Sequence, residues 1–364
     1  MRVFYDHQIF CRQNFGGISR YFFELIKGFA NNQQIQSSFS ARFTNNFFAN
    51  ELINERNLLS TASFKGKKDI VRLLNDFITQ KKLQKQEFDI YHPTYYNSHL
   101  LKYNIGKPLV VTVHDLVDEK FNNINPKFTG LIAQRKEMIQ RADRVIAISE
   151  STRKDLLELF SIPADKICTI YHGNSLQADI NPLGNRKKYI LYVGSRSGIH
   201  KNFTAFLNAA ILFLKKESDY QLICAGDNPF TAKELALINQ YNLSNKIIHQ
   251  AIVNDEQLAR LYVDASLLIY PSLYEGFGFP IVEAFACGCP VLTNSASSMI
   301  EIAADEAFYF SSNYPEEMCT DILNALHNHE QREIKTKAGI LKAKDFTWQN
   351  TLQKTTAVYQ TLGS

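Results

Sequence analysis

The chain has 364 residues, of which 45% are hydrophobic, and its formal net charge is +4. This length favours two domains and this apolar content is enough for two packed cores, which excludes a largely disordered protein. The small net charge gives no support for nucleic-acid binding, and no apolar run reaches the roughly 20 residues of a membrane-spanning helix. We therefore expect a cytoplasmic protein, in contact with a membrane surface at most peripherally.

Short apolar runs alternate with helical patterns along the chain, an order that is typical of α/β domains with parallel sheets. The expected strands are, in chain order, Val3–Tyr5, Ile90–Tyr91, Leu109–Val113, Val145–Ile148, Ile167–Tyr171, Tyr189–Val193, Gln221–Ala225, Lys246–Gln250, Leu267–Tyr270 and Val291–Thr293. The clearest helix follows Gly16 and Gly17, where apolar residues recur from Ile18 to Phe29 at helical spacing. Another begins near Asn254, a good N-cap residue.

A polar segment over residues 176–188 interrupts this alternation and is predicted to be a linker. It separates a domain over 1–175 from a second over 189–345. The last stretch, 346–364, is helical, and its apolar stripe leaves two alternatives open: it packs on its own domain or crosses back to the first.

Basic side chains are frequent between residues 65 and 107: Lys65, Lys67, Lys68, Arg72, Lys81, Lys82, Lys85, Lys102 and Lys107. One interpretation is a solvated helix face, because acidic residues interrupt the run. The other is contact with anionic lipid, or with a lipid-phosphate acceptor, at the inner membrane surface.

The segment after Tyr270 is the most informative about which ligands the protein binds. A strand ends there, and the next loop carries four candidate site residues: Glu275, Gly276, Phe277 and Gly278. Pro280 suits the start of a helix that Gly288 ends. This strand–loop–helix geometry offers backbone N–H groups to a phosphate or a sugar hydroxyl.

Glu275 and Glu283 are suited to accept hydrogen bonds from hydroxyl pairs, one on a sugar and the other on a ribose. The alternative is that Glu283 only favours the helix N-terminus and that Glu275 is a solvated loop residue. Glycines and Pro280 in register with both carboxylates favour the first interpretation.

This spacing and its flanks resemble the E-x7-E signature of family 4 glycosyltransferases, and the resemblance covers nearly the whole chain. It implies the GT-B fold, in which two Rossmann-like domains face each other across a cleft. It also implies an enzyme that moves a hexose from a nucleotide-diphosphate sugar with retention at the anomeric carbon, without a metal or another cofactor.

Two basic residues follow the strand that ends at Gly194. An Arg196 fork and the point charge of Lys201 suit a diphosphate leaving group, and the resemblance implies that both neutralise its charge. The family places a glycine-rich loop, here Gly16 and Gly17, close to the donor phosphate.

Further residues come from the same resemblance. His114 ends an apolar strand, where ligands bind in open α/β sheets, and the family places a histidine there beside the reacting sugar. Asp115 is expected to orient His114 or shape its loop, and His92 is a weaker acceptor-side candidate. The backbone of Ile252 and Val253 is expected to contact the nucleobase.

The sequence departs from common glycosyltransferase motifs in two places, and these limit the roles that the resemblance implies. The family often has proline before the residue matched by Glu301, and here Ile300 precedes it, so we retain Glu301 only as a helix-start residue. No Asp-x-Asp motif is present, so we predict no metal site, with basic residues and helix dipoles acting on the diphosphate instead. Cys287 and Cys289 lack a second pair at zinc spacing.

The donor is predicted to be a UDP-sugar, with UDP-glucose first as a family base rate. GDP-mannose is next, because the Gly16–Tyr21 segment with His114-Asp115 resembles bacterial surface-polysaccharide transferases, some of which add mannose. A polysaccharide or lipid-linked oligosaccharide acceptor fits that context. Two alternatives are a nucleotide-sugar epimerase of similar fold and a non-catalytic nucleotide-sugar-binding protein.

Overall fold

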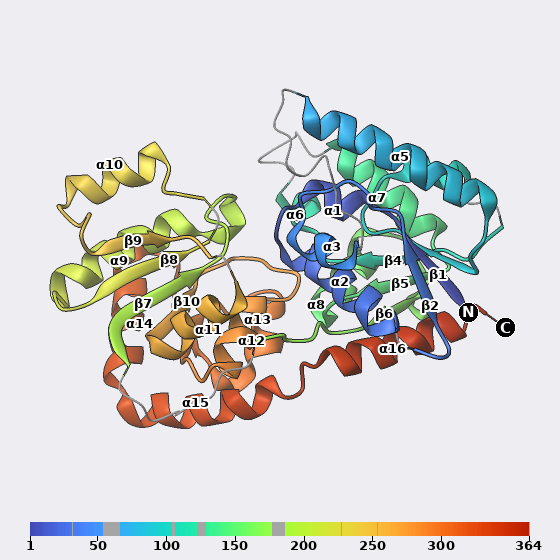
Figure 1. Cartoon of the computed structure of the whole chain (residues 1–364). Helices are drawn as coiled ribbons and strands as arrows, with labels where there is room; N and C mark the ends of the chain where they lie inside the picture. Colours follow the sequence, from blue (N-terminus) through green and yellow to red (C-terminus); the bar gives the residue numbers. More distant parts are fainter. Residues whose placement is uncertain are drawn as a thin grey trace. The chain divides into compact units, whose positions relative to one another are not determined.

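The computed structural model describes residues 1–30, 32–53, 66–103, 106–121, 129–176, 186–226, 228–252 and 254–363. The chain divides into two compact units (Figure 1). The first is Met1–Gly173 together with Trp348–Ser364, and the second is Asn174–Thr347. Each is an α/β unit built on parallel strands, which confirms the fold class expected from the sequence.

The described part of the first unit contains six parallel strands: β1 (Arg2–Tyr5), β2 (Gln36–Phe39), β3 (Ile90–His92), β4 (Val110–Val113), β5 (Arg144–Ala147) and β6 (Ile167–Thr169). They form two three-stranded groups in the orders β2-β1-β3 and β4-β5-β6, and a parallel bridge between Tyr91 and Leu109 links the groups. The strands are joined by α1 (Gln8–Arg12), α2 (Gly17–Ala30), α3 (Phe47–Leu52), α5 (Lys67–Lys85), α6 (Val117–Phe121), α7 (Thr129–Arg141) and α8 (Glu150–Leu159).

Helix α2 lies where its apolar spacing predicted it. Tyr21, Phe22, Leu25, Ile26 and Phe29 are buried together in one core cluster of the first unit. Most expected strands are also present within a residue or two. Strand β2 was not expected, because its Gln-Ser-Ser-Phe sequence is polar and its side chains are only partly buried.

The C-terminal helix α16 (Trp348–Gln360) packs on the first unit, so the chain crosses back. The hydroxyl of Tyr359 lies 2.8 Å from that of Tyr5 and 2.6 Å from Nδ1 of His92. A Cβ at Gly28 of α2 would lie 2.4 Å from a methyl carbon of Leu352, so the glycine permits this close packing.

The second unit has one six-stranded parallel sheet in the order β12-β11-β10-β7-β8-β9. Its strands are β7 (Lys187–Val193), β8 (Gln221–Ala225), β9 (Ile247–Gln250), β10 (Ala265–Tyr270), β11 (Val291–Thr293) and β12 (Phe308–Tyr309). Its helices are α9 (Phe203–Lys216), α10 (Ala232–Gln240), α11 (Asp255–Asp264), α12 (Phe279–Ala286), α13 (Ser298–Ala303), α14 (Pro315–His327) and α15 (His329–Ala343).

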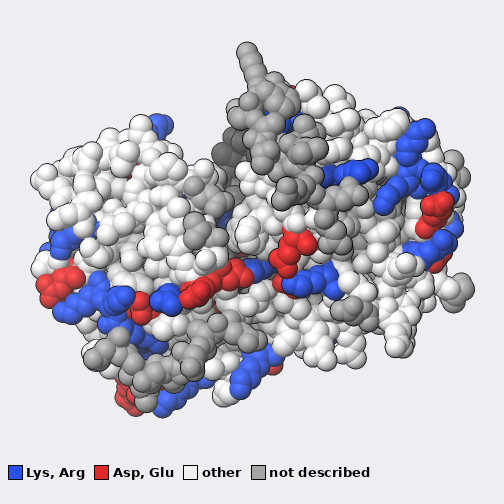
Figure 2. All heavy atoms as spheres, viewed as in Figure 1, with Lys and Arg blue, Asp and Glu red and all other residues white. Residues whose placement is uncertain are grey.

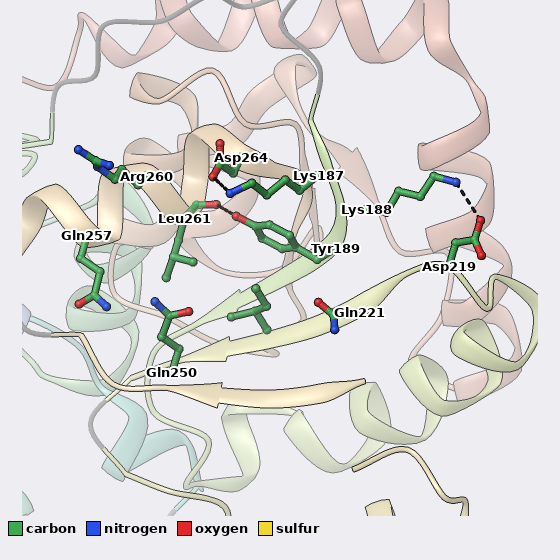
Figure 3. A pocket seen from close by; sticks show the side chains of 11 residues that line it. Lys187, Lys188, Tyr189, Asp219, Gln221, Gln250, Gln257, Arg260, Leu261 and Asp264 are labelled. Atoms are coloured by element: carbon green, nitrogen blue, oxygen red, sulfur yellow. Dashed lines mark hydrogen bonds and ion pairs between the residues drawn. The ribbon is translucent and has the colours of Figure 1, made fainter. Parts of the chain in front are cut away.

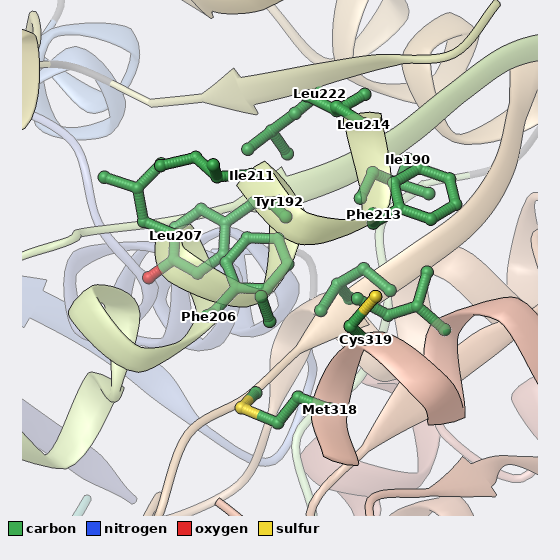
Figure 4. Close-up of a cluster of buried hydrophobic side chains, with 14 of the residues drawn as sticks. Ile190, Tyr192, Phe206, Leu207, Ile211, Phe213, Leu214, Leu222, Met318 and Cys319 are labelled. Atoms are coloured by element: carbon green, nitrogen blue, oxygen red, sulfur yellow. The ribbon is translucent and has the colours of Figure 1, made fainter. Parts of the chain in front are cut away.

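Helices α9 and α14 enclose one core of this unit against the sheet (Figure 4). Phe206 and Phe213 of α9 are fully buried there, together with Met318 and Cys319 of α14. The helix start predicted near Asn254 is also confirmed, because the Asn254 side chain caps α11 by accepting from the N–H of Gln257. Within the ranges given above, no helix has the length and apolar character to cross a membrane.

The Tyr359 contacts give a stability prediction. Tyr359→Phe removes one hydroxyl from a fully buried group and leaves the Tyr5 hydroxyl and the His92 ring nitrogen each short of a partner. We expect the free energy of unfolding to fall by about 1–3 kcal/mol, measured by urea denaturation. Gln353→Ala, on the exposed side of the same helix, is the control, and equal values for both variants would contradict the role of the hydroxyl.

Candidate functional site

The strand order of the second unit marks the place where a ligand is expected. From β7 the chain moves outward to β8 and β9, then returns to β10 on the other side of β7 and continues to β11. The loops after β7 and β10 therefore diverge at the carboxyl ends of two adjacent parallel strands, which is where open α/β sheets bind ligands. Lys201 and Glu275 lie on these two loops.

The structure brings these two residues together. Nζ of Lys201 lies 2.7 Å from Oε1 of Glu275, although 74 positions separate them in the sequence. The loops are also joined directly, because the N–H of Leu273 donates to the carbonyl of His200 at 2.7 Å. Burial alone would raise the pKa of Glu275, but the charge and hydrogen bond of Lys201 outweigh it, so the net pKa is lowered and the carboxyl stays ionised.

Two serines that the sequence gave no reason to select hold the Glu275 loop. Oγ of Ser297 accepts from the N–H of Glu275 at 3.2 Å and donates to its carbonyl at 2.5 Å. Oγ of Ser298 lies 2.9 Å from the carbonyl oxygens of both Glu275 and Phe277. Gly278 then starts α12 with a φ of 107°, a conformation that a side chain would strain.

Pro280 lies in the first positions of α12, as predicted. Glu283 is buried further along this helix, and its Oε2 accepts from the Tyr262 hydroxyl of α11 at 2.8 Å. The first turn of α12 contains no acidic residue, so Glu283 does not act there on the helix N-terminus. Its ribose-binding role stays a prediction.

Arg196 is engaged by its own unit. Its Nε lies 3.2 Å from Oε1 of Glu234, and its Nη2 donates to the carbonyls of Asn228 and Pro229 at 2.8 and 2.7 Å. The guanidinium carbon also lies 4.8 Å from the centre of the Phe230 ring. These contacts anchor the loop after β7, so in this structure the charge of Arg196 is already paired.

The remaining second-unit candidates lie near strand ends. Ile252 is half-buried just after β9, whereas Val253 lies outside the described residues. Gly276 and Phe277 are buried in the loop after β10. Glu301 lies in the first turn of α13, which confirms it as a helix-start residue.

His114 of the first unit lies just after β4 and is 6% exposed. Its ring stacks on that of His172, with centroids 5.6 Å apart, and meets the edge of Tyr21 at 5.2 Å. Burial, followed by the positive charge of Arg135, lowers its pKa to about 3, so the ring is neutral. Nε2 has no hydrogen-bond partner among the described residues, which leaves this buried atom available to a ligand hydroxyl.

The neighbours of His114 have structural contacts. Asp115 accepts from the N–H of Val117 at 3.2 Å and so shapes the loop. His92 is fully buried, and its nitrogens contact Tyr359 and the Thr112 hydroxyl, so the structure assigns this acceptor-side candidate to the core. Gly16 and Gly17 lie at the start of α2, with Gly17 exposed.

A cavity of about 520 Å³ lies elsewhere in the second unit (Figure 3). Its walls come from the amino end of β7, from β8 and β9, and from α11. It contains the ion pairs Lys187–Asp264 at 2.6 Å and Lys188–Asp219 at 3.0 Å, and none of the candidate site residues lines it. The candidate site is therefore the strand-end loops rather than this cavity.

Comparison with known proteins identifies the family of this chain. Residues 15–177 match the model of glycosyltransferase family 4, and residues 175–341 match that of glycosyl transferases group 1. The O-antigen chain mannosyltransferase B of Escherichia coli is 30% identical over 75% of this chain and 74% of its own length. The chain belongs to glycosyltransferase family 4.

Two more relatives extend this family 4 comparison. The serotype-specific mannosyltransferase WbdA of Escherichia coli is 26% identical over 72% of this chain, which spans only 35% of WbdA. Anabaena Alr3699/HepE in complex with UDP-glucose aligns with a TM-score of 0.73 over 99% of this chain and 100% of that one, at 18% identity. This structural likeness confirms the GT-B fold of the glycosyltransferase.

The buried histidines give a pH prediction. Burial lowers the pKa of both His92 and His114 to about 3. We expect the imidazole ¹⁵N resonances of both rings to stay those of the neutral form from neutral pH down to about pH 4, whereas an unperturbed histidine would titrate near 6.5. His114→Gln identifies its signals, and a protonation step of His114 between about pH 5 and 8 would contradict the burial argument.

Proposed function

We propose that this glycosyltransferase moves a hexose from a nucleotide-diphosphate sugar, bound at the carboxyl ends of β7 and β10, to a saccharide or lipid-linked saccharide acceptor. We propose further that it acts with retention at the anomeric carbon and without a metal. The observation that supports this most is the Lys201–Glu275 pair at the strand-order reversal of the second unit. It offers a cation for the diphosphate beside a carboxylate for sugar hydroxyls.

The proposed step is cleavage of the bond between the anomeric carbon and the phosphate oxygen. The electron pair goes to that oxygen, and the Lys201 charge offsets the negative charge that develops there. The acceptor hydroxyl oxygen then bonds to the anomeric carbon on the same face, and its proton passes to the departing phosphate. Glu275, kept ionised by its lowered pKa, accepts hydrogen bonds from the sugar.

Arg196 and the glycine loop complete the donor proposal. Because the Arg196 guanidinium is paired with Glu234, we propose that it contributes mainly by fixing the loop that carries Lys201. Gly17 is exposed at the start of α2, where a backbone N–H can face a phosphate. Glu283 and the backbone of Ile252 are proposed for the ribose and the nucleobase.

His114 is proposed as a sugar contact. Its neutral ring and unpartnered, buried Nε2 suit a hydrogen bond with a hydroxyl of the donor sugar or the acceptor. A neutral imidazole does not add positive charge beside an oxocarbenium-like carbon, which is consistent with such a place.

For the donor, we propose GDP-mannose ahead of UDP-glucose. The sequence alone ranked UDP-glucose first as a family base rate. The two Escherichia coli relatives are both named mannosyltransferases, whereas the structure that contains UDP-glucose is only 18% identical. Family membership also favours transfer over the epimerase and non-catalytic alternatives.

The leaving-group proposal is tested with Lys201 and Arg196. Lys201→Ala should lower turnover by about tenfold to a thousandfold, because one charge-stabilising group is lost, and should lower the melting temperature, because the largely buried Glu275 loses its partner. Arg196→Ala should lower turnover at least about tenfold and also lower the melting temperature, because Glu234 loses its partner.

The readout is nucleoside diphosphate released in the presence of a saccharide acceptor. Lys188→Ala, which removes an exposed lysine paired with Asp219, is the matched control and should retain wild-type turnover. Wild-type turnover in Lys201→Ala would remove the proposed role of that residue.

The donor proposal is tested by thermal shift with GDP, UDP, ADP and dTDP in excess EDTA. GDP should stabilise the protein most, by about 2.7 kcal/mol at a hundredfold excess over its Kd, and the shift should be much smaller in Lys201→Ala. A larger shift with UDP would return UDP-glucose to first place. If no nucleotide stabilises the protein, or if metal must be added back, the donor-site proposal or its metal independence fails.

A further inference from the structure

Helix α5 of the first unit has polar residues among its buried positions. Its buried positions recur every fourth residue and are Val71, Asn75, Thr79 and Leu83. The Asn75 amide accepts from the N–H groups of Arg42 and Phe43 at 3.0 and 3.2 Å and donates to the Phe43 carbonyl at 2.6 Å. The helix is therefore fixed to its unit by hydrogen bonds of Asn75 as well as by the packing of Val71 and Leu83.

Thr79 has the same function one turn later. Its hydroxyl lies 2.7 Å from Nδ1 of His7 and 2.6 Å from the Ser40 hydroxyl. Asp76 of the same helix lies 3.3 Å from Nε2 of His7. These buried contacts determine which face of α5 is turned to the protein, and so which face is turned outward.

The outward face is apolar. Ile70, Leu73, Leu74 and Phe77 are 45%, 63%, 39% and 59% exposed. They follow the i, i+3, i+4, i+7 spacing of one helix face. In a surface helix of a globular protein this stripe would face the core, so α5 has inverted amphipathicity. A contiguous apolar stripe on the outside is typical of a surface that meets a partner or a membrane.

The helix that carries this stripe is also rich in basic side chains. The sequence Lys67–Lys85 contains six lysines and arginines against two aspartates, and Asp76 is one of these, beside His7. Figure 2 shows Lys and Arg side chains gathered on the side of the molecule where α5 runs. Nζ of Lys81 lies 5.4 Å from the centre of the Phe77 ring, so charge and apolar surface are adjacent.

We propose that the outward face of α5 docks on an anionic lipid surface. Leucine, isoleucine and phenylalanine on one face with lysines beside them are the composition of helices that lie in the membrane interface. The apolar side chains enter the acyl boundary while the long lysine side chains reach the anionic headgroups. A protein partner for the same stripe would not require these basic side chains, and a second copy of α5 would repel it.

An aromatic group near the start of α5 extends the surface. Phe15 and Phe47 are both exposed, with ring centroids 6.0 Å apart. Nζ of Lys67 lies 3.3 Å from Oδ1 of Asn45, two residues before Phe47, so the segment that leads to Phe47 contacts the first turn of α5. Aromatic side chains of this kind favour the headgroup region.

This docking concerns a surface and not the reaction, so it is tested without activity. Purified protein is sedimented with vesicles of phosphatidylcholine alone or with about one third phosphatidylglycerol. Wild type should bind the anionic vesicles, less at high salt, and bind the neutral ones weakly. Leu73→Gln with Phe77→Gln should weaken binding at least about tenfold, and Lys81→Gln with Lys85→Gln should weaken binding to anionic vesicles by about tenfold or more.

The matched control is Ile334→Gln with Leu341→Gln on α15 of the second unit, where the two side chains are 52% and 63% exposed. It removes similar apolar area and should leave vesicle binding and melting temperature unchanged. The proposal is overturned if wild type does not bind anionic vesicles, or if the α15 control loses binding as the α5 variant does. It is also overturned if wild type is a dimer that Leu73→Gln with Phe77→Gln dissociates.

Discussion

The candidate site depends on one ion pair, which forms between the loops after two adjacent parallel strands of the second unit. Lys201 follows β7 and Glu275 follows β10, and their adjacency in the sheet brings residues 74 positions apart to 2.7 Å. Each charge satisfies the other, and the pKa of the Glu275 carboxyl is lowered accordingly. Under the proposed function, a diphosphate sugar would replace this contact with two others, a phosphate for Lys201 and hydroxyls for Glu275. The pair therefore keeps the Glu275 carboxyl ionised and holds both side chains in place.

Some buried polar atoms in the first unit have hydrogen-bond partners among the described residues and a few do not, and Nε2 of His114 is one of those that do not. The hydroxyl of Tyr359 lies between Tyr5 and His92, and the other nitrogen of His92 contacts Thr112. This network ties α16 to the sheet, and it explains why His92 is structural although its strand-end position resembles that of His114. Only the hydrogen-bond partners distinguish the two histidines, because burial lowers both pKa values alike.

The sequence predicted the features that the chemistry of neighbouring residues determines, namely strands and helix starts. Strands β7 and β10 contain the apolar runs Tyr189–Val193 and Leu267–Tyr270, and Asn254 and Pro280 lie at helix starts. It missed what depends on tertiary contact: the polar edge strand β2, the Ser297 and Ser298 hydroxyls on the Glu275 loop, and the pairing of Arg196 with Glu234. No spacing rule connects Arg196 with a glutamate 38 positions away, so the sequence alone indicates that Arg196 is available to a ligand.

Helix α5 shows most clearly which features the sequence predicts and which depend on tertiary contacts. Periodicity reveals that its apolar residues share a face, but it cannot say whether that face is inside or outside, because the usual rule assumes an apolar core. Here the hydrogen bonds of Asn75 and Thr79 to buried groups fix the inward face, so Leu73 and Phe77 lie on the outward face. Composition left the basic stretch as either a solvated face or a lipid contact. The exposed apolar stripe on the same helix is the observation on which the proposed lipid docking rests. Since no residue of α5 belongs to the proposed donor site, the reaction and the docking surface can each fail without the other.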